Sequence, residues 1–84
     1  MNPRKTLAKI LAGSKSIRFA DMTRLAAAFG FRLSRISGSH HIFTHPGIPE
    51  LVNLQAVGGE VKPYQVRQFL RLVERYNLQL TDEA

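Results

Sequence analysis

The chain has 84 residues, no cysteine and a formal charge of +6, from 12 lysine and arginine side chains against six acidic ones. This length allows one domain, residues 1–84, with a small core, and the lack of cysteine excludes disulfides and thiolate chemistry. The longest apolar run, Leu25 to Phe29, is too short for a membrane span or a secretory signal, so we expect a cytoplasmic protein with no membrane partner.

The N-terminal arm, residues 1–16, is predicted to contain a short helix. Asn2 can cap the free backbone amides, and Pro3 has no amide to leave unpaired at the first helical position. The apolar side chains of the arm share one helical face: Leu7, Ile10 and Leu11. A helix this short is marginal alone, so we expect the arm to dock on the domain or to mediate a homo-oligomer.

A second helix is predicted from Ala20 or Asp21 to Phe29, with Gly30 as its stop. Asp21 near its start suits the positive end of the helix dipole. The apolar positions recur three and four residues apart, as on one face of an α-helix: Met22, Leu25, Ala26 and Phe29.

Three strands are predicted next, because the period of the sequence changes from helical to alternating. The first covers residues 31–36 and ends in a turn or bulge at 37–39, the second covers 41–44, and the third covers 51–54. Residues 45–49 form a break, since they contain two prolines, which cannot sit in a central strand. This order indicates an antiparallel meander.

The last helix is predicted from Pro63 to about Tyr76 or Asn77. Its apolar face is made of Val66, Phe69, Leu70 and Val73. Together the elements indicate an α+β fold of helix, three antiparallel strands and helix, with both helices on one face of the sheet. The core domain would cover residues 19–77, and a tail, residues 78–84, would fray at its acidic end from Thr81.

All three histidines lie within the segment GSHHIFTHP: His40, His41 and His45. A histidine can take a proton from one oxygen and give one to another near neutral pH, and RNA cleavage needs both steps, at the 2′-hydroxyl and at the leaving oxygen. Gly38 would let a substrate backbone approach, and Ser39 could donate a hydrogen bond to phosphate. The cluster also fits strand-edge histidines whose ring nitrogens are hydrogen-bonded within the fold.

His40 and His41 are adjacent, so on a regular strand they point to opposite faces of the sheet. The alternation does not show which of them points to the core, because each shares its face with a good core residue, Ile42 or Phe43. A bulge at Ser37 would reverse the assignment.

A metal site is disfavoured by the spacing of the histidines. Four positions of extended chain separate His41 from His45 by roughly 13 Å, too far for one ion. The nearby carboxylates are limited to Glu50, and most zinc sites use closer or cysteine-containing ligand sets. We therefore expect no metal and no cofactor.

The basic residues favour a nucleic-acid partner, because clustered arginine and lysine are the electrostatic footprint of such binding. Arg67, Arg71 and Arg75 recur every four residues along the last helix, and Arg32 and Arg35 flank the histidine strand. Either group could contact phosphates or could simply be solvated surface. The charge could also increase solubility or bind an acidic protein.

The segment GFRLSRISGSHHIFTHP, followed by a short strand and KPYQVRQFL, resembles the HicA-type toxins of bacterial toxin–antitoxin pairs. The Gly-Phe strand entry, the Gly-Ser-His turn and the Lys-Pro start of the last helix match in this order. The resemblance covers residues 19–76 and implies a fold similar to double-stranded-RNA-binding domains. It also implies a metal-independent endoribonuclease that cleaves mRNA and is neutralised by a HicB-type antitoxin covering the active face.

The resemblance assigns the catalytic role to His40, the histidine that follows Gly-Ser. His41 is the second choice, and Ser39 completes the candidate catalytic site. The candidate RNA-binding residues are all basic: Arg32, Arg35, Lys62, Arg67, Arg71 and Arg75. The alternatives are a non-catalytic RNA-binding module of the same fold and a dimerisation protein with no RNA role.

Overall fold

The computed structural model describes residues 1–81. Within this part, three helices and four strands follow one another along the chain: α1 (Pro3–Leu11), α2 (Phe19–Ala28), β1 (Arg32–Ser37), β2 (His40–His45), β3 (Ile48–Val57), β4 (Glu60–Val61) and α3 (Pro63–Arg75). The α+β class is confirmed, and every helix and strand predicted from the sequence is present.

The four strands form one antiparallel sheet in chain order, β1-β2-β3-β4. The meander predicted for the first three strands is therefore confirmed. The fourth strand is not predicted, because two residues are too few to show an alternating pattern. They pair with Ala56 and Val57 at the end of β3.

The break expected at residues 45–49 is wrong in its extent. β3 begins at Ile48 and includes Pro49, so the turn between β2 and β3 contains only residues 46–47. Proline is tolerated here because β4 pairs only with the far end of β3, which leaves the outer edge of β3 open around Pro49 among the described residues. On the inner edge, the register with β2 also shifts at this point.

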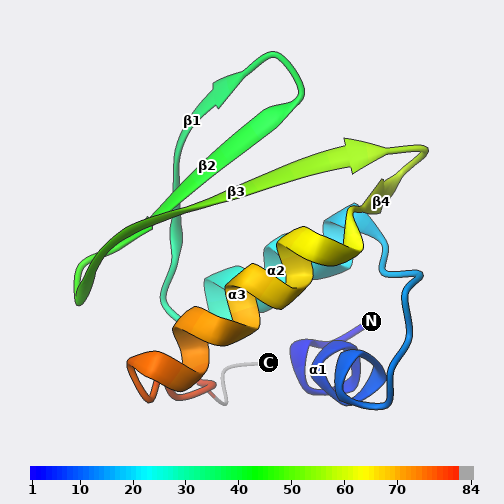
Figure 1. The fold of residues 1–84 in the computed structure, drawn as a ribbon, viewed down its shortest axis with the longest axis horizontal. Helices are drawn as coiled ribbons and strands as arrows, with labels where there is room; N and C mark the ends of the chain where they lie inside the picture. Colours follow the sequence, from blue (N-terminus) through cyan, green and yellow to red (C-terminus); the bar gives the residue numbers. More distant parts are fainter. Residues whose placement is uncertain (82–84) are drawn as a thin grey trace.

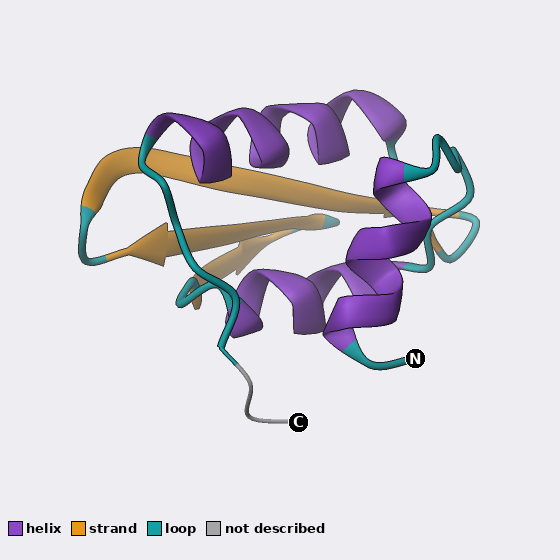
Figure 2. Cartoon of the chain, turned by 90° about the horizontal axis from the view of Figure 1, so that it is seen from below, coloured by secondary structure: helices purple, strands orange, loops and turns teal. Residues whose placement is uncertain are grey.

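Helices α2 and α3 lie side by side on one face of the sheet, as predicted, and no other element within residues 1–81 covers the opposite face (Figures 1 and 2). The core forms between the helices and the sheet, and its buried members include Met22, Leu25, Ala26, Phe29, Phe43, Val52, Leu54, Val66 and Phe69. Phe69 is fully buried, with its ring centre 5.7 Å from that of Phe29 and 5.3 Å from that of Phe31. This packing decides which side chains of the strands point away from the helices.

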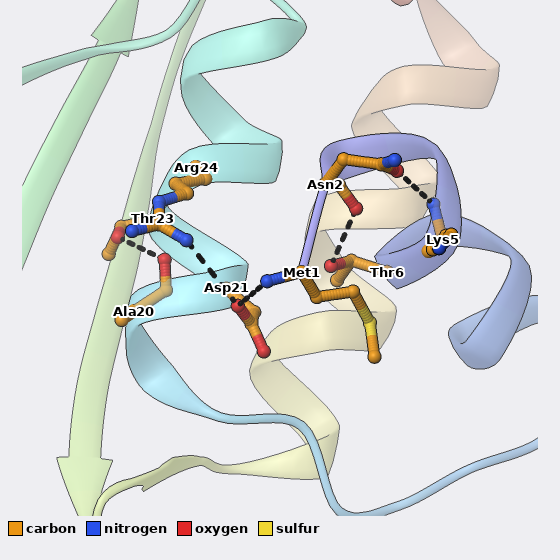
Figure 3. Close-up of polar contacts among 8 residues, drawn as sticks. All are labelled: Met1, Asn2, Lys5, Thr6, Ala20, Asp21, Thr23 and Arg24. Carbon is orange, nitrogen blue, oxygen red and sulfur yellow. Dashed lines mark hydrogen bonds and ion pairs between the residues drawn. The ribbon is translucent and has the colours of Figure 1, made fainter. Parts of the chain in front are cut away.

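Helix α1 packs on α2 on the side away from the sheet and forms a third layer (Figure 1). The side chain of Asn2 accepts a hydrogen bond of 2.9 Å from the backbone N–H of Lys5, which confirms the predicted cap (Figure 3). The predicted apolar face is wrong at one position, because Leu11 is 70% exposed and Thr6 is buried instead. The Thr6 hydroxyl donates to the Asn2 carbonyl at 3.2 Å, so its burial leaves no polar group unpaired.

After α3 the chain turns back along the helical layer. Leu78 and Leu80 are half-buried against the core, and Thr81 donates from its backbone N–H and its hydroxyl to the Ala28 carbonyl, each at 3.0 Å. The expectation that the tail frays is therefore wrong at Thr81, and its remaining part, residues 82–84, lies outside the described residues. Within residues 1–81, no helix has the length and apolar character needed to cross a bilayer.

Candidate functional site on the open face of the sheet

The open face is the face of the sheet opposite α2 and α3, and it carries His40. Residues directly opposite each other in antiparallel strands share a face. His41 pairs with Leu54 and faces the helices, since its ring centre lies 4.7 Å from that of Phe19 at the start of α2. His40 is the adjacent residue of β2, so it points to the open face, with Gln55 as its neighbour on β3. The structure thus shows which of the two histidines faces away from the helices, a choice that the alternating pattern of the sequence leaves open.

A bulge in β1 brings two arginines onto the open face. Arg32 pairs with Thr44 and Arg35 pairs with Ile42, because the register shifts in the middle of β1. Ile42 and Thr44 lie on either side of the buried Phe43 in β2, so they share the face of His40. The two arginines are three positions apart, with two residues between them, so in a regular strand they would point to opposite faces. The sequence predicts an irregularity only at the turn after β1. It therefore does not predict that both arginines lie on the same face of the sheet.

Asn53 of β3 orients the imidazole of His40. Nδ1 of His40 lies 3.1 Å from Oδ1 of Asn53. An amide oxygen only accepts hydrogen bonds, so in this orientation the ring proton lies on Nδ1 and Nε2 carries the free lone pair. His40 is half-buried, which lets the ring be held while it still reaches solvent. The arrangement holds the imidazole of His40 in one orientation on the open face.

The turn between β1 and β2 is hydrogen-bonded to β3, and the same residue of β3 is hydrogen-bonded to α3. Gly38 has a φ of 62°, a left-handed conformation that glycine adopts without steric cost. The Gln55 side chain donates to Oγ of Ser39 at 2.9 Å, and the Gln55 backbone N–H donates to the buried Gln65 side chain at 2.8 Å. Ser39 accepts in this contact, so its own hydroxyl proton is still available for a phosphate.

Asn53 and Gln55 do not appear among the residues predicted from the sequence. The sequence does contain a pattern that could have identified them. Asn53 and Gln55 alternate with the buried residues Val52 and Leu54, so they share the solvent-facing side of β3. The pairing of Asn53 with His40 nevertheless depends on the register between β2 and β3. That register is set by the turn and by core packing, neither of which can be read from the alternation.

His41 and His45 both pack against the helical side. His41 is half-buried, and its Nδ1 lies 3.3 Å from the carbonyl oxygen of Ser39. The ring centre of His45 lies 5.0 Å from that of Phe31, and its Nδ1 accepts a hydrogen bond of 2.9 Å from the Gly47 N–H. Within residues 1–81, no group of three or more His, Asp or Glu side chains could hold a metal ion.

The basic residues of α3 lie away from His40. Arg67 and Arg71 are exposed on a helix that covers the opposite side of the sheet (Figure 1). Lys62, just before this helix, holds its Nζ 6.0 Å from the ring centre of Tyr64. The candidate RNA-binding residues therefore form two groups: Arg32 and Arg35 on the open face, and Lys62, Arg67, Arg71 and Arg75 on the helical side.

Glu50 links β3 to the end of α3. The Tyr76 hydroxyl donates to one carboxylate oxygen of Glu50 at 2.6 Å, and Nη1 of Arg75 lies 3.1 Å from the other. The hydrogen bond from Tyr76, together with the weaker effects of Arg75, lowers the pKa of Glu50 below its ordinary value. The same hydrogen bond raises the pKa of Tyr76. Arg75 is thus already paired within the fold, whereas Arg67 and Arg71 form no ion pair with any of the described residues.

Glu50→Gln should make stability less dependent on acid pH. A carboxylate whose pKa is lowered by folding stabilises the protein above its unfolded pKa, and this contribution is lost as the pH falls through the folded pKa. Urea unfolding at a series of pH values below 4.5, the ordinary pKa of the group, should show a shallower loss of stability in the variant. Glu74→Gln, on the exposed side of α3, is the control and should behave like the unmodified chain. Equal slopes for Glu50→Gln and the unmodified chain would contradict the prediction.

A family model described as "HicA toxin of bacterial toxin-antitoxin" matches residues 19–74, well over half of the chain. The chain belongs to the HicA toxin family. The resemblance seen in the sequence is confirmed, and with it a fold like that of double-stranded-RNA-binding domains. HicA proteins are the toxins of bacterial toxin–antitoxin pairs, so an antitoxin is the partner of this chain. Comparisons with curated proteins and with solved structures gave no match.

The HicA match begins at the first residue of α2 and ends in the last turn of α3. It includes the whole sheet, the Gly38-Ser39 turn and every candidate RNA-binding residue except Arg75. Helix α1, the third layer, lies before the HicA match.

Proposed function

We propose that this HicA protein is a metal-independent endoribonuclease that cleaves mRNA in the cytoplasm and uses His40 for proton transfer. The main support is the geometry around His40, which lies on the open face with its ring oriented by Asn53. Arg32 and Arg35 share this face, so phosphate-binding groups lie on the same surface as the base. Membership in a toxin family fits this activity, because cleavage of mRNA arrests growth.

In the proposed reaction, Nε2 of His40 takes the proton of an RNA 2′-hydroxyl. The 2′ oxygen then forms a bond to the adjacent phosphorus, and the bond from phosphorus to the 5′ oxygen breaks. The imidazolium returns the proton to the leaving 5′ oxygen. The products are a 2′,3′-cyclic phosphate and a 5′-hydroxyl end. Asn53 is a positioning residue, since its carbonyl oxygen accepts the Nδ1 proton in both charge states of the ring.

The phosphate would be held by Ser39, Arg32 and Arg35. A guanidinium group forms two parallel hydrogen bonds with phosphate, and the Ser39 hydroxyl has a proton to donate. Donors of this kind stabilise the negative charge that develops on the phosphate oxygens as the 2′ oxygen attacks.

A non-catalytic RNA-binding module is the second candidate. It is favoured by the lack of a partner acid: among the described residues, the ring of His40 is hydrogen-bonded to Asn53 and to no carboxylate or second histidine. A single group must then act as both base and acid. An RNA-binding module would not need such a group.

RNA cleavage in the presence of EDTA tests the proposal. The full chain should still cleave RNA in EDTA, and should leave DNA and 2′-deoxy-substituted RNA intact because the attacking 2′-hydroxyl is missing. Binding of RNA without cleavage would favour the RNA-binding module, and an affinity without salt dependence would exclude both. Activity that is lost in EDTA and restored by a divalent cation would contradict metal independence.

The two basic groups should differ in their effects on RNA binding. Arg35→Ala should weaken binding of both long RNA and a short oligoribonucleotide, because Arg35 shares the face of His40. Arg71→Ala should weaken binding of long RNA only, because α3 lies on the other side of the sheet. For each lost phosphate contact, the slope of log affinity against log salt should decrease by about 1. Unchanged slopes in Arg71→Ala with long RNA would assign the α3 arginines to solvent or to a protein partner.

A further inference from the structure

Strand β1 is an edge of the sheet with an open outer side. Among residues 1–81, β1 pairs only with β2, so its outer row of backbone N–H and C=O groups faces away from the molecule (Figure 1). All six residues of β1 are exposed. An open edge of this kind is a template for a further strand, and native proteins usually cover or protect it.

An apolar strip reaches this edge and is left uncovered. Leu33 is 49% exposed and Ile36 is 56% exposed. They are directly opposite Phe43 and His41, which face the helices, so Leu33 and Ile36 extend the helix-facing side of the sheet. The helices bury Phe43 but do not extend over the two β1 residues. A strand added to β1 would place its own side chains beside them.

The arginines on the other face of β1 indicate which charge an added strand would have. Within residues 1–81, neither Arg32 nor Arg35 forms an ion pair. Two copies of this chain paired through β1 would bring the arginines of both copies onto one face, and like charges on neighbouring strands are destabilising. An acidic strand would instead place carboxylates beside the guanidinium groups. The charge of +6 on the whole chain favours the same partner.

We propose that the outer edge of β1 binds an extended, acidic segment of a protein partner as an additional strand. Alternate side chains of this segment would be apolar and cover Leu33 and Ile36, while the intervening carboxylates would bind Arg32 and Arg35. The inference rests on the proposed function, because a segment that binds these arginines removes the groups that hold RNA beside His40. The partner strand and RNA would then compete for the open face.

The test uses the full, isotope-labelled chain and a synthetic peptide of alternating Glu and Val. Peptide binding should slow hydrogen exchange at backbone amides of β1 and should displace bound RNA. Two control peptides isolate the causes: one has alternate amides N-methylated, which blocks strand pairing, and one has Lys in place of Glu. Each control peptide should bind at least about tenfold more weakly than the Glu peptide. The N-methylated peptide loses backbone hydrogen bonds to β1, and the Lys peptide places positive charges beside Arg32 and Arg35.

Two variants of the chain complete the experiment. Ile36→Ser should weaken binding of the Glu peptide, whereas Leu51→Ser, a similarly exposed apolar residue on β3, should not. Equal binding of the N-methylated peptide, or of the Lys peptide, would overturn the proposal. Protection of β1 amides by concentration-dependent dimerisation without peptide would assign the edge to a second copy. Peptide binding is measured in an assay that does not depend on RNA cleavage. A failure of the strand-binding proposal can therefore be distinguished from a failure of the proposed nuclease activity.

Discussion

Replacing His40 by alanine should lower RNA cleavage at least about 10²-fold, a typical loss for a general acid–base residue. RNA affinity and the fold should be retained, because His40 lies on the open face and outside the core. Single-turnover cleavage at saturating protein, with binding measured separately, distinguishes loss of chemistry from loss of affinity. In the unmodified chain the cleavage rate should also fall at acid pH, since a protonated imidazole cannot accept the 2′-hydroxyl proton.

His41→Ala is the matched control, because the same residue type is removed one position along the strand. The ring of His41 packs edge-on against Phe19, so we expect the variant to lose stability and only a modest part of its cleavage rate. Circular dichroism and a thermal melt of both variants establish that they are folded. Normal cleavage by His40→Ala, with no cleavage by a folded His41→Ala, would move the catalytic role to His41.

Phe69→Ala should lower the free energy of unfolding by about 3–5 kcal/mol, the usual cost of removing a buried phenylalanine side chain. Phe69 is fully buried, and its ring lies against those of Phe29 and Phe31, so the neighbouring rings cannot close the cavity by small movements. A domain of this size is stable by only about 0.05–0.15 kcal/mol per residue. The variant should therefore unfold at much lower urea concentration.

Tyr64→Ala on the same helix is the control for Phe69→Ala. Tyr64 is 46% exposed, and surface substitutions usually change stability by no more than about 0.5 kcal/mol. Urea unfolding followed by circular dichroism measures both variants. A similar loss in the two variants would show that Phe69 does not have the central place in the core that its burial indicates.

The sequence by itself determined the helices, three of the strands and the candidate residues. These features depend on interactions within a few positions along the chain, such as the Asn2 cap of α1 or the helical spacing of Met22 and Leu25 in α2. The same locality explains the errors. Thr6 is buried and Leu11 is exposed because the buried side of α1 is set by its packing on α2, a tertiary contact that no local pattern encodes.

Only the tertiary structure decided which side chains share the open face. The bulge in β1 places Arg32 and Arg35 together, and the register between β2 and β3 places Asn53 beside His40. Both depend on pairing between residues far apart in the sequence, and a shift of one residue sends every side chain of a strand to the other face. The alternation therefore identifies His40 and His41 as candidates, while the packing of His41 on α2 is what leaves His40 on the open face.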